Sequence, residues 1–60
     1  MLYIYKIVKE NIVNGERGKR TRTIMRSEPL KINGLYCHLG DGLKGFYRVL
    51  ELVGTEPLED

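Results

Sequence analysis

The sequence contains one cysteine, one histidine and no tryptophan, and these scarcities exclude several classes of protein. A single cysteine cannot form an internal disulfide, and one Cys with one His cannot supply the ligands of a zinc site. No apolar run approaches the roughly 20 residues that a membrane-spanning helix needs. Lysines interrupt the apolar start and no small-residue cleavage site follows it, so we expect no secretory signal. These features predict a cytoplasmic protein without metal, cofactor or membrane contact.

Charge is unevenly distributed along the 60 residues, although the net charge is only +2. Residues 1–27 carry seven basic and two acidic side chains, a balance of +5, whereas residues 28–60 carry three basic and six acidic ones, a balance of −3. Such asymmetry indicates either a polyanion partner or attraction between the two halves, within one chain or between two. A chain this short buries a small core, so self-association is a further route to stability.

Strand signals dominate the chain, and no segment has the spacing and caps of a helix. Turn residues separate four segments rich in residues that favour strands, at 2–13, 19–27, 30–40 and 46–53. A kink or bulge is expected at Asn33-Gly34. The pattern predicts an all-β protein: a small curled antiparallel sheet or SH3-like barrel of four to five strands with two tight hairpins. One domain is expected over residues 1–54, followed by a flexible acidic tail over residues 55–60.

Asn14-Gly15 predicts the first hairpin, because both residues accept the positive φ of a tight two-residue turn. The numbers of facing residues then sum to 29, which places Glu10 opposite Lys19. A longer loop through residues 16–18 would shift this register. The expected core face holds Leu2, Ile4, Val8, Ile12, Thr21, Thr23 and Met25. The opposite face is aromatic and basic, with Tyr3, Tyr5, Ile7, Lys9, Arg20, Arg22, Ile24 and Arg26.

Gly40, Gly42 and Gly45 form the pattern G-x-G-x-x-G, which cradles a pyrophosphate when it joins a strand to a helix. The residues after Gly45 predict a strand instead, so we interpret the glycines as turn and bulge residues of a second hairpin around Asp41-Gly42. Its facing residues have numbers that sum to 83. The expected core face holds Leu35, Cys37, Leu39, Phe46, Leu50 and Leu52, and the other face holds Tyr36, His38, Tyr47, Val49 and Val53.

Two groups of residues are candidate binding sites. A basic and aromatic group could neutralise phosphates and stack on bases, and the alternative is a solvated face on which Arg stems cover Tyr rings. Its members are Lys9, Arg20, Arg22, Arg26, Tyr3 and Tyr5. The second group is an aromatic interaction patch, which a closed barrel would half-bury. Its members are Tyr36, His38 and Tyr47.

Cys37 and His38 are adjacent, which raises the question of a catalytic pair. Neighbours on a strand point to opposite faces, so the two side chains cannot form a dyad. We expect Cys37 to be a small core residue and His38 to lie at the surface.

The stretch from Gly34 to Leu52 resembles a hairpin of a small uncharacterised bacterial domain family with an SH3-like sheet. The shared pattern is G-x-Y-x-H, from Gly34 to His38, and Y-x-V-L, from Tyr47 to Leu50. It covers about a third of the chain. The resemblance implies a β fold and no particular activity.

No nucleophile, base or metal constellation stands out in the sequence, so we expect no enzyme. The expected function is that of a non-enzymatic interaction module, which acts on a protein partner or on a second copy of itself as a homodimer. Nucleic-acid binding by a small β-barrel with a Tyr/Arg face is the alternative.

Overall fold

The computed structural model describes residues 1–40 and 42–58, which form one antiparallel sheet of four strands. The strands are β1 (Leu2–Glu10), β2 (Arg17–Arg26), β3 (Leu35–Gly40) and β4 (Leu43–Glu56), and no helix occurs in the described part of the chain. Their order across the sheet is β2-β1-β4-β3. The predicted all-β class is confirmed. The sheet is not closed, so the curled open form describes this protein better than a barrel.

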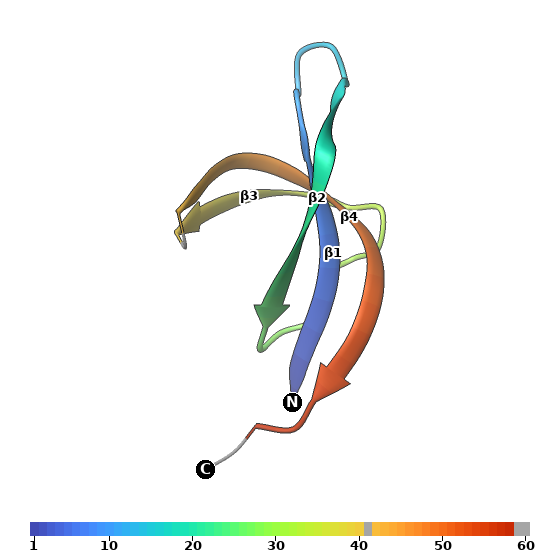
Figure 1. The fold of residues 1–60 in the computed structure, drawn as a ribbon, viewed down its shortest axis with the longest axis vertical. Coiled ribbons are helices and arrows are strands. Elements are labelled where there is room, and N and C mark those ends of the chain that lie inside the picture. The colour runs from blue at the N-terminus through green and yellow to red at the C-terminus, as the bar shows by residue number, and fades with distance from the viewer. Residues whose placement is uncertain (41, 59–60) are drawn as a thin grey trace.

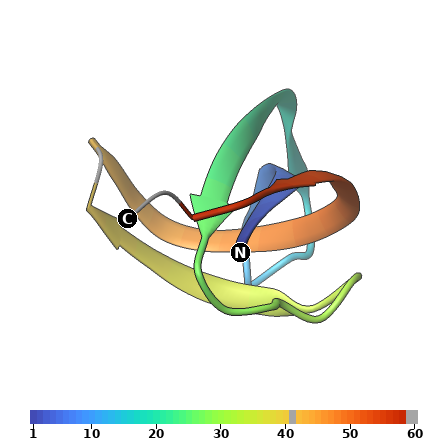
Figure 2. The same cartoon turned by 90° about the horizontal axis from the view of Figure 1, so that it is seen from below.

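Curvature gives the sheet an inner and an outer side (Figures 1 and 2). The β1–β2 hairpin projects at one end of the molecule, the β3–β4 hairpin projects to the side, and β4 arcs around β1. The pairing of β1 with β4 shifts register twice, between Ile4 and Tyr5 and between Lys6 and Ile7. Such bulges bend a strand and increase its twist. They allow the long β4 to pair with β1 along one part of its length and with β3 along another.

The first hairpin has the predicted register over most of its length but a different turn. Tyr3 to Val8 pair with Arg26 to Thr21 as predicted, whereas Glu10 pairs with Arg17 and not with Lys19. Asn11 and Glu16 close a wider loop with a 2.8 Å backbone hydrogen bond. The predicted two-residue turn needs a positive φ at both Asn14 and Gly15, but within this loop only Gly15 has one. The prediction of that turn is therefore wrong. The register change is even, so the paired residues on either side of it keep their predicted faces.

The second hairpin has the predicted register without interruption. Tyr36 pairs with Tyr47 and Cys37 with Phe46, as expected. Asp41 of the predicted turn lies outside the described residues. Gly45 has a φ of 123° yet continues the ladder, so the bulge expected there does not form. The glycine-rich stretch joins two strands, as predicted, and its interpretation as hairpin chemistry is supported.

The connection between β2 and β3 joins the two edges of the sheet. Asn33 has a φ of 66°, and a Cβ at Gly34 would lie 2.9 Å from the Lys31 carbonyl oxygen, which requires glycine. The kink predicted at these two residues is therefore confirmed. Tyr5 anchors the connection, because its hydroxyl accepts a 2.8 Å hydrogen bond from the Leu30 amide.

The core lies on the inner face of the sheet, which is the face predicted to be aromatic and basic. It consists of Tyr5, Ile7, Ile24, Tyr47 and Val49, with Tyr3, Leu30, Tyr36 and Leu43 packed against it. The predicted core face is the outer face and is largely exposed. Its exposed members include Ile12, Met25, Leu35, Cys37, Leu39, Phe46 and Leu52, and Val8 is the buried exception.

Polar partners satisfy two of the tyrosines on the inner side of the sheet. Buried tyrosines need a partner for the hydroxyl, and Tyr5 and Tyr36 find one in Leu30 and His38. Aliphatic side chains have no polar group that needs a partner, so they can remain exposed on the outer face. Thr55 and Glu56 of the predicted tail pair with β1 as part of β4, and residues 59–60 of it lie outside the described residues.

Candidate functional site

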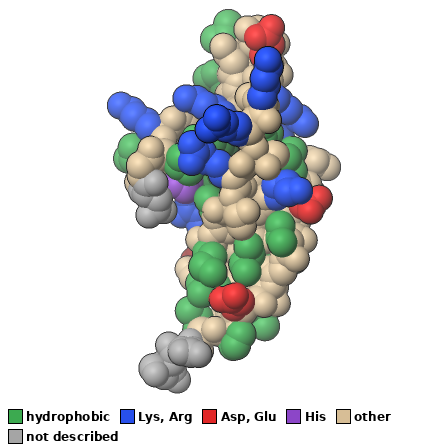
Figure 3. All heavy atoms as spheres, viewed as in Figure 1, with side chains coloured by type: hydrophobic (Ala, Val, Ile, Leu, Met, Phe, Trp, Pro, Cys, Tyr) green, Lys and Arg blue, Asp and Glu red, His purple; other side chains and the backbone are tan. Residues whose placement is uncertain are grey.

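A hollow of about 500 Å³ opens between the two hairpins and is lined mainly by basic side chains. Its cations come from three strands, namely Lys9 from β1, Lys19, Arg20 and Arg22 from β2, and Lys44 from β4. Gly18, Gly42, Leu43 and Tyr47 complete the lining of this basic hollow. Lys and Arg side chains gather over β2 and towards the β3–β4 hairpin on the face shown in Figure 3.

The register of the sheet positions these cations. Arg22 pairs with Ile7, and Arg20 lies two residues away, so both side chains leave β2 on the inner face. Lys9 pairs with Tyr47, and its stem passes over Gly45, where a Cβ would lie 3.6 Å from Lys9 Cε. Such a Cβ would make only an ordinary contact with Lys9, so it is the φ of 123° that favours glycine at this position.

No acidic side chain balances the basic hollow within the described residues. None of its five cations forms an ion pair there, and its described lining contains no Asp or Glu. The other described ion pairs use different cations: Lys6 lies 3.9 Å from Glu51, and Arg17 and Arg48 contact Glu10. Clustered charge of one sign in a concave surface raises the local positive potential and attracts anions.

The structure brings together only part of the predicted nucleic-acid group. Lys9, Arg20 and Arg22 line the hollow as a cluster. Arg26 does not, because its guanidinium lies 3.0 Å from His38 Nδ1 and over the Tyr36 ring, 5.6 Å from the centroid.

The two tyrosines of that group are also absent from the lining. Tyr5 is 2% exposed, and the half-buried Tyr3 stacks on it with ring centroids 6.4 Å apart. Neither ring is presented to a ligand in the hollow.

Two cations of the hollow, Lys19 and Lys44, are absent from the group predicted from the sequence. The predicted register sets Lys19 opposite Glu10, where its charge would be neutralised, but the register change gives that carboxylate to Arg17. Lys44 is distant in sequence from the other cations, and only the curl of the sheet brings it near them. The adjacency of Lys19 and Arg20 is the one sequence signal that points to either residue.

The predicted interaction patch of Tyr36, His38 and Tyr47 is a packed cluster instead of an exposed surface. His38 is 1% exposed and Tyr47 is 4% exposed, so the prediction of a surface histidine is wrong. The His38 ring contacts both tyrosine rings edge-on, at centroid distances of 5.6 and 5.9 Å. Burial raises the pKa of Tyr36, which keeps its hydroxyl neutral.

His38 joins the two edge strands through its Nδ1 atom. Arg26 Nη2 lies 3.0 Å from this atom and the Tyr36 hydroxyl lies 2.9 Å from it. A guanidinium only donates hydrogen bonds, so Nδ1 is the acceptor and carries no proton. Because β2 and β3 do not pair with each other, this contact helps to hold the open side of the curled sheet.

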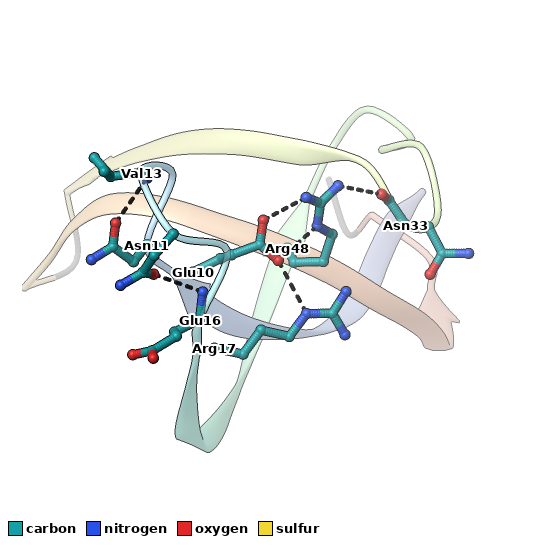
Figure 4. Close-up of polar contacts among 8 residues, drawn as sticks. Glu10, Asn11, Val13, Glu16, Arg17, Asn33 and Arg48 are labelled. Atoms are coloured by element: carbon teal, nitrogen blue, oxygen red, sulfur yellow. Dashed lines mark hydrogen bonds and ion pairs between the residues drawn. The ribbon is translucent and has the colours of Figure 1, made fainter.

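Glu10 forms the centre of a second polar cluster, on the outer face (Figure 4). Arg48 Nε donates to its Oε1 atom at 3.1 Å and Arg17 Nε to the same oxygen at 3.0 Å, while Arg48 Nη2 donates to Oε2. Arg48 Nη1 also donates to the Asn33 carbonyl at 2.8 Å. The hydrogen bond from Arg48 chiefly holds the pKa of Glu10 below its ordinary value. This cluster ties β1, β2, β4 and the β2–β3 connection together.

The described residues lack both a metal-ligand cluster and a membrane-spanning helix. They contain no group of three or more His, Cys, Asp and Glu side chains placed to hold a metal ion. The described part of the chain likewise has no helix long and apolar enough to cross a membrane. Cys37 is exposed while His38 is buried, so the two point apart as predicted, but Cys37 is not a core residue.

Comparisons with protein-family models, curated proteins and solved structures found no match for this chain. The resemblance of residues 34–52 to a bacterial domain family therefore stays a prediction.

Proposed function

We propose that this protein is a small non-enzymatic binding module that holds nucleic acid through the phosphates, in the basic hollow. The observation that carries the proposal is the convergence of five cations from three strands on one concavity, without an acid in its described lining. Each Lys or Arg that neutralises a phosphate releases condensed counterions, and this release drives binding without any sequence motif.

The test measures the affinity of the protein for fluorescently labelled nucleic acid at low salt. A single strand and a duplex are titrated in separate experiments. Arg20→Ala and Lys44→Ala, from opposite sides of the hollow, should each weaken binding several-fold and reduce its salt dependence. Lys31→Ala is the matched control, because Lys31 is an exposed cation outside the hollow. Equal losses from all three variants, or no binding at low salt, would contradict the proposal.

A second candidate function is self-association through the outer face of β3 and β4. Leu35, Leu39 and Phe46 are exposed there beside Cys37, and Leu39 reaches 80% exposure. Of the two edge strands, β3 carries no Lys, Arg, Asp or Glu, whereas β2 carries five cations. Two copies would repel each other through β2 but not through β3, so a second copy is the partner that this surface fits.

Sedimentation velocity over a range of concentrations tests this second candidate. The mass should rise with concentration, and Leu39→Lys should abolish the rise. Val13→Lys, at a 91% exposed position on the other hairpin, is the control. A constant monomer mass would reject self-association.

A further inference from the structure

The basic hollow offers no exposed aromatic ring on which a base could stack. Tyr47 is the one aromatic residue in its described lining, and it is only 4% exposed because it is packed between Tyr36 and His38. Proteins that hold single strands through their bases present open aromatic rings, and stacking on these rings supplies a large part of their affinity. That contribution is absent here.

The hollow also has few groups that read the edges of bases. Its described lining contains no Asn, Gln, Asp, Glu, Ser or Thr side chain. These side chains supply the paired donors and acceptors that recognise adenine and cytosine. Lysine and arginine remain. Both bind phosphates regardless of sequence, and the base edge that they recognise is that of guanine, which the all-pyrimidine probe below lacks.

The size of the hollow limits the form of nucleic acid that can enter it. A volume of about 500 Å³ equals a cube about 8 Å on a side. A duplex is wider than its major groove, which alone measures about 12 Å. A duplex can therefore touch only the rim of the hollow, whereas one extended phosphate chain can lie inside it.

The projecting β1–β2 hairpin is the alternative route to a duplex, because two-stranded ribbons enter major grooves. Its loop carries exposed Ile12 and Val13 together with Glu16, and no cation lies in residues 11–16. Arg17, at the base of the loop, is bound to Glu10. The tip would bring an acid and apolar groups towards the phosphates, so this route is disfavoured.

We propose that the basic hollow binds one single strand of nucleic acid by its phosphates and leaves the bases unread. The inference rests on the proposed function, and it adds the form of the nucleic acid and the absence of sequence preference. On charge alone a duplex would bind more tightly, since it carries one charge per about 1.7 Å of axis. A preference for the single strand therefore reports entry into the hollow.

The experiment measures fluorescence anisotropy with four probes of about 12 nucleotides, a length within the range that small β-barrels cover. The probes are a mixed single strand, its duplex, an all-pyrimidine strand and an abasic strand with the same phosphates. At about 50 mM salt the single strands should bind at least about 10-fold more tightly than the duplex. The abasic strand should bind within about threefold of the mixed strand, because stacking supplies little of the affinity.

The dependence of the binding constant on salt concentration reports the number of phosphate contacts. A hollow about 8 Å across holds about two successive phosphates of an extended strand, and two such contacts give a log–log slope of about −1.4, which is about a sevenfold loss between about 50 and 200 mM salt. Arg22→Ala should reduce the slope by about 0.7, and the Lys31→Ala control should leave it unchanged.

Each other outcome overturns a distinct statement. Tighter binding of the duplex would reject the single-strand inference and leave phosphate binding standing. A loss of more than about 10-fold with the abasic strand would show that bases are read. No binding of any probe would reject the inference together with the proposed function.

Discussion

Arg48 and Glu10 form a two-point ion pair on the outer face of the sheet, although 38 residues separate them in the chain. The same guanidinium bonds the Asn33 carbonyl, so one side chain joins β4, β1 and the β2–β3 connection. The pair fixes the end of β1 relative to β4, and these two strands supply Lys9 and Lys44 to the lining of the basic hollow.

Replacing Glu10 with Gln should lower the melting temperature. The change leaves two arginines, Arg48 and Arg17, without the carboxylate that they share. Glu51→Gln is the matched control, since its ion pair with Lys6 is exposed and 3.9 Å long, and it should change the stability by less than about 0.5 kcal/mol. Thermal unfolding of both variants measures the difference, and equal melting temperatures would mean that the Glu10 cluster adds nothing.

The stabilisation from Glu10 should depend on pH. Its pKa lies below the ordinary value of 4.5 in the folded protein, chiefly because Arg48 donates hydrogen bonds to the ionised form. The contribution is therefore complete above the ordinary pKa and is lost as the pH falls through the lower folded value. Urea unfolding at a series of pH values should show a constant gap between wild type and Glu10→Gln above about pH 5, which narrows in acid. A gap that does not change with pH would contradict this assignment.

Replacing His38 with Phe should destabilise the protein, although phenylalanine is more apolar. Nδ1 of His38 accepts from Arg26 and contacts the Tyr36 hydroxyl, and its loss leaves these partly buried groups without that partner, at a cost of about 1 kcal/mol. Leu39→Phe, on the exposed outer face of the same strand, should stay within about 0.5 kcal/mol of wild type. Denaturant titration compares the free energies of unfolding of the two variants. An unchanged stability of His38→Phe would indicate that the histidine faces solvent.

Cys37 should react with a thiol reagent in the folded state. Its side chain is exposed on the outer face, opposite Phe46. The rate of reaction with a chromogenic disulfide should be comparable in native buffer and in urea, since folding does not cover the thiol. Strong protection in native buffer would place Cys37 inside the core or inside an interface between two copies, and dilution of the protein would separate these two cases.

Much of this fold follows from local signals in the sequence. The alternation of side chains and the turn residues predict four strands, the two hairpins and most of their pairs, such as Ile4 with Met25 and Tyr36 with Tyr47. They also predict which residues share a face, because a strand has a strict period of two. The grouping of Lys9 with Arg20 and Arg22 follows from this period and the predicted hairpin register, and all three residues line the basic hollow.

Tertiary structure alone decided which face became the interior. The β1–β4 bulges set the direction of curl, and the contact of Arg26 with His38 holds two edge strands that share no backbone ladder. These interactions join residues far apart in the chain, so no local pattern encodes them. They bury the tyrosines and expose the aliphatic face. They also bring Lys44 to the cations of β2, and together these side chains line the basic hollow.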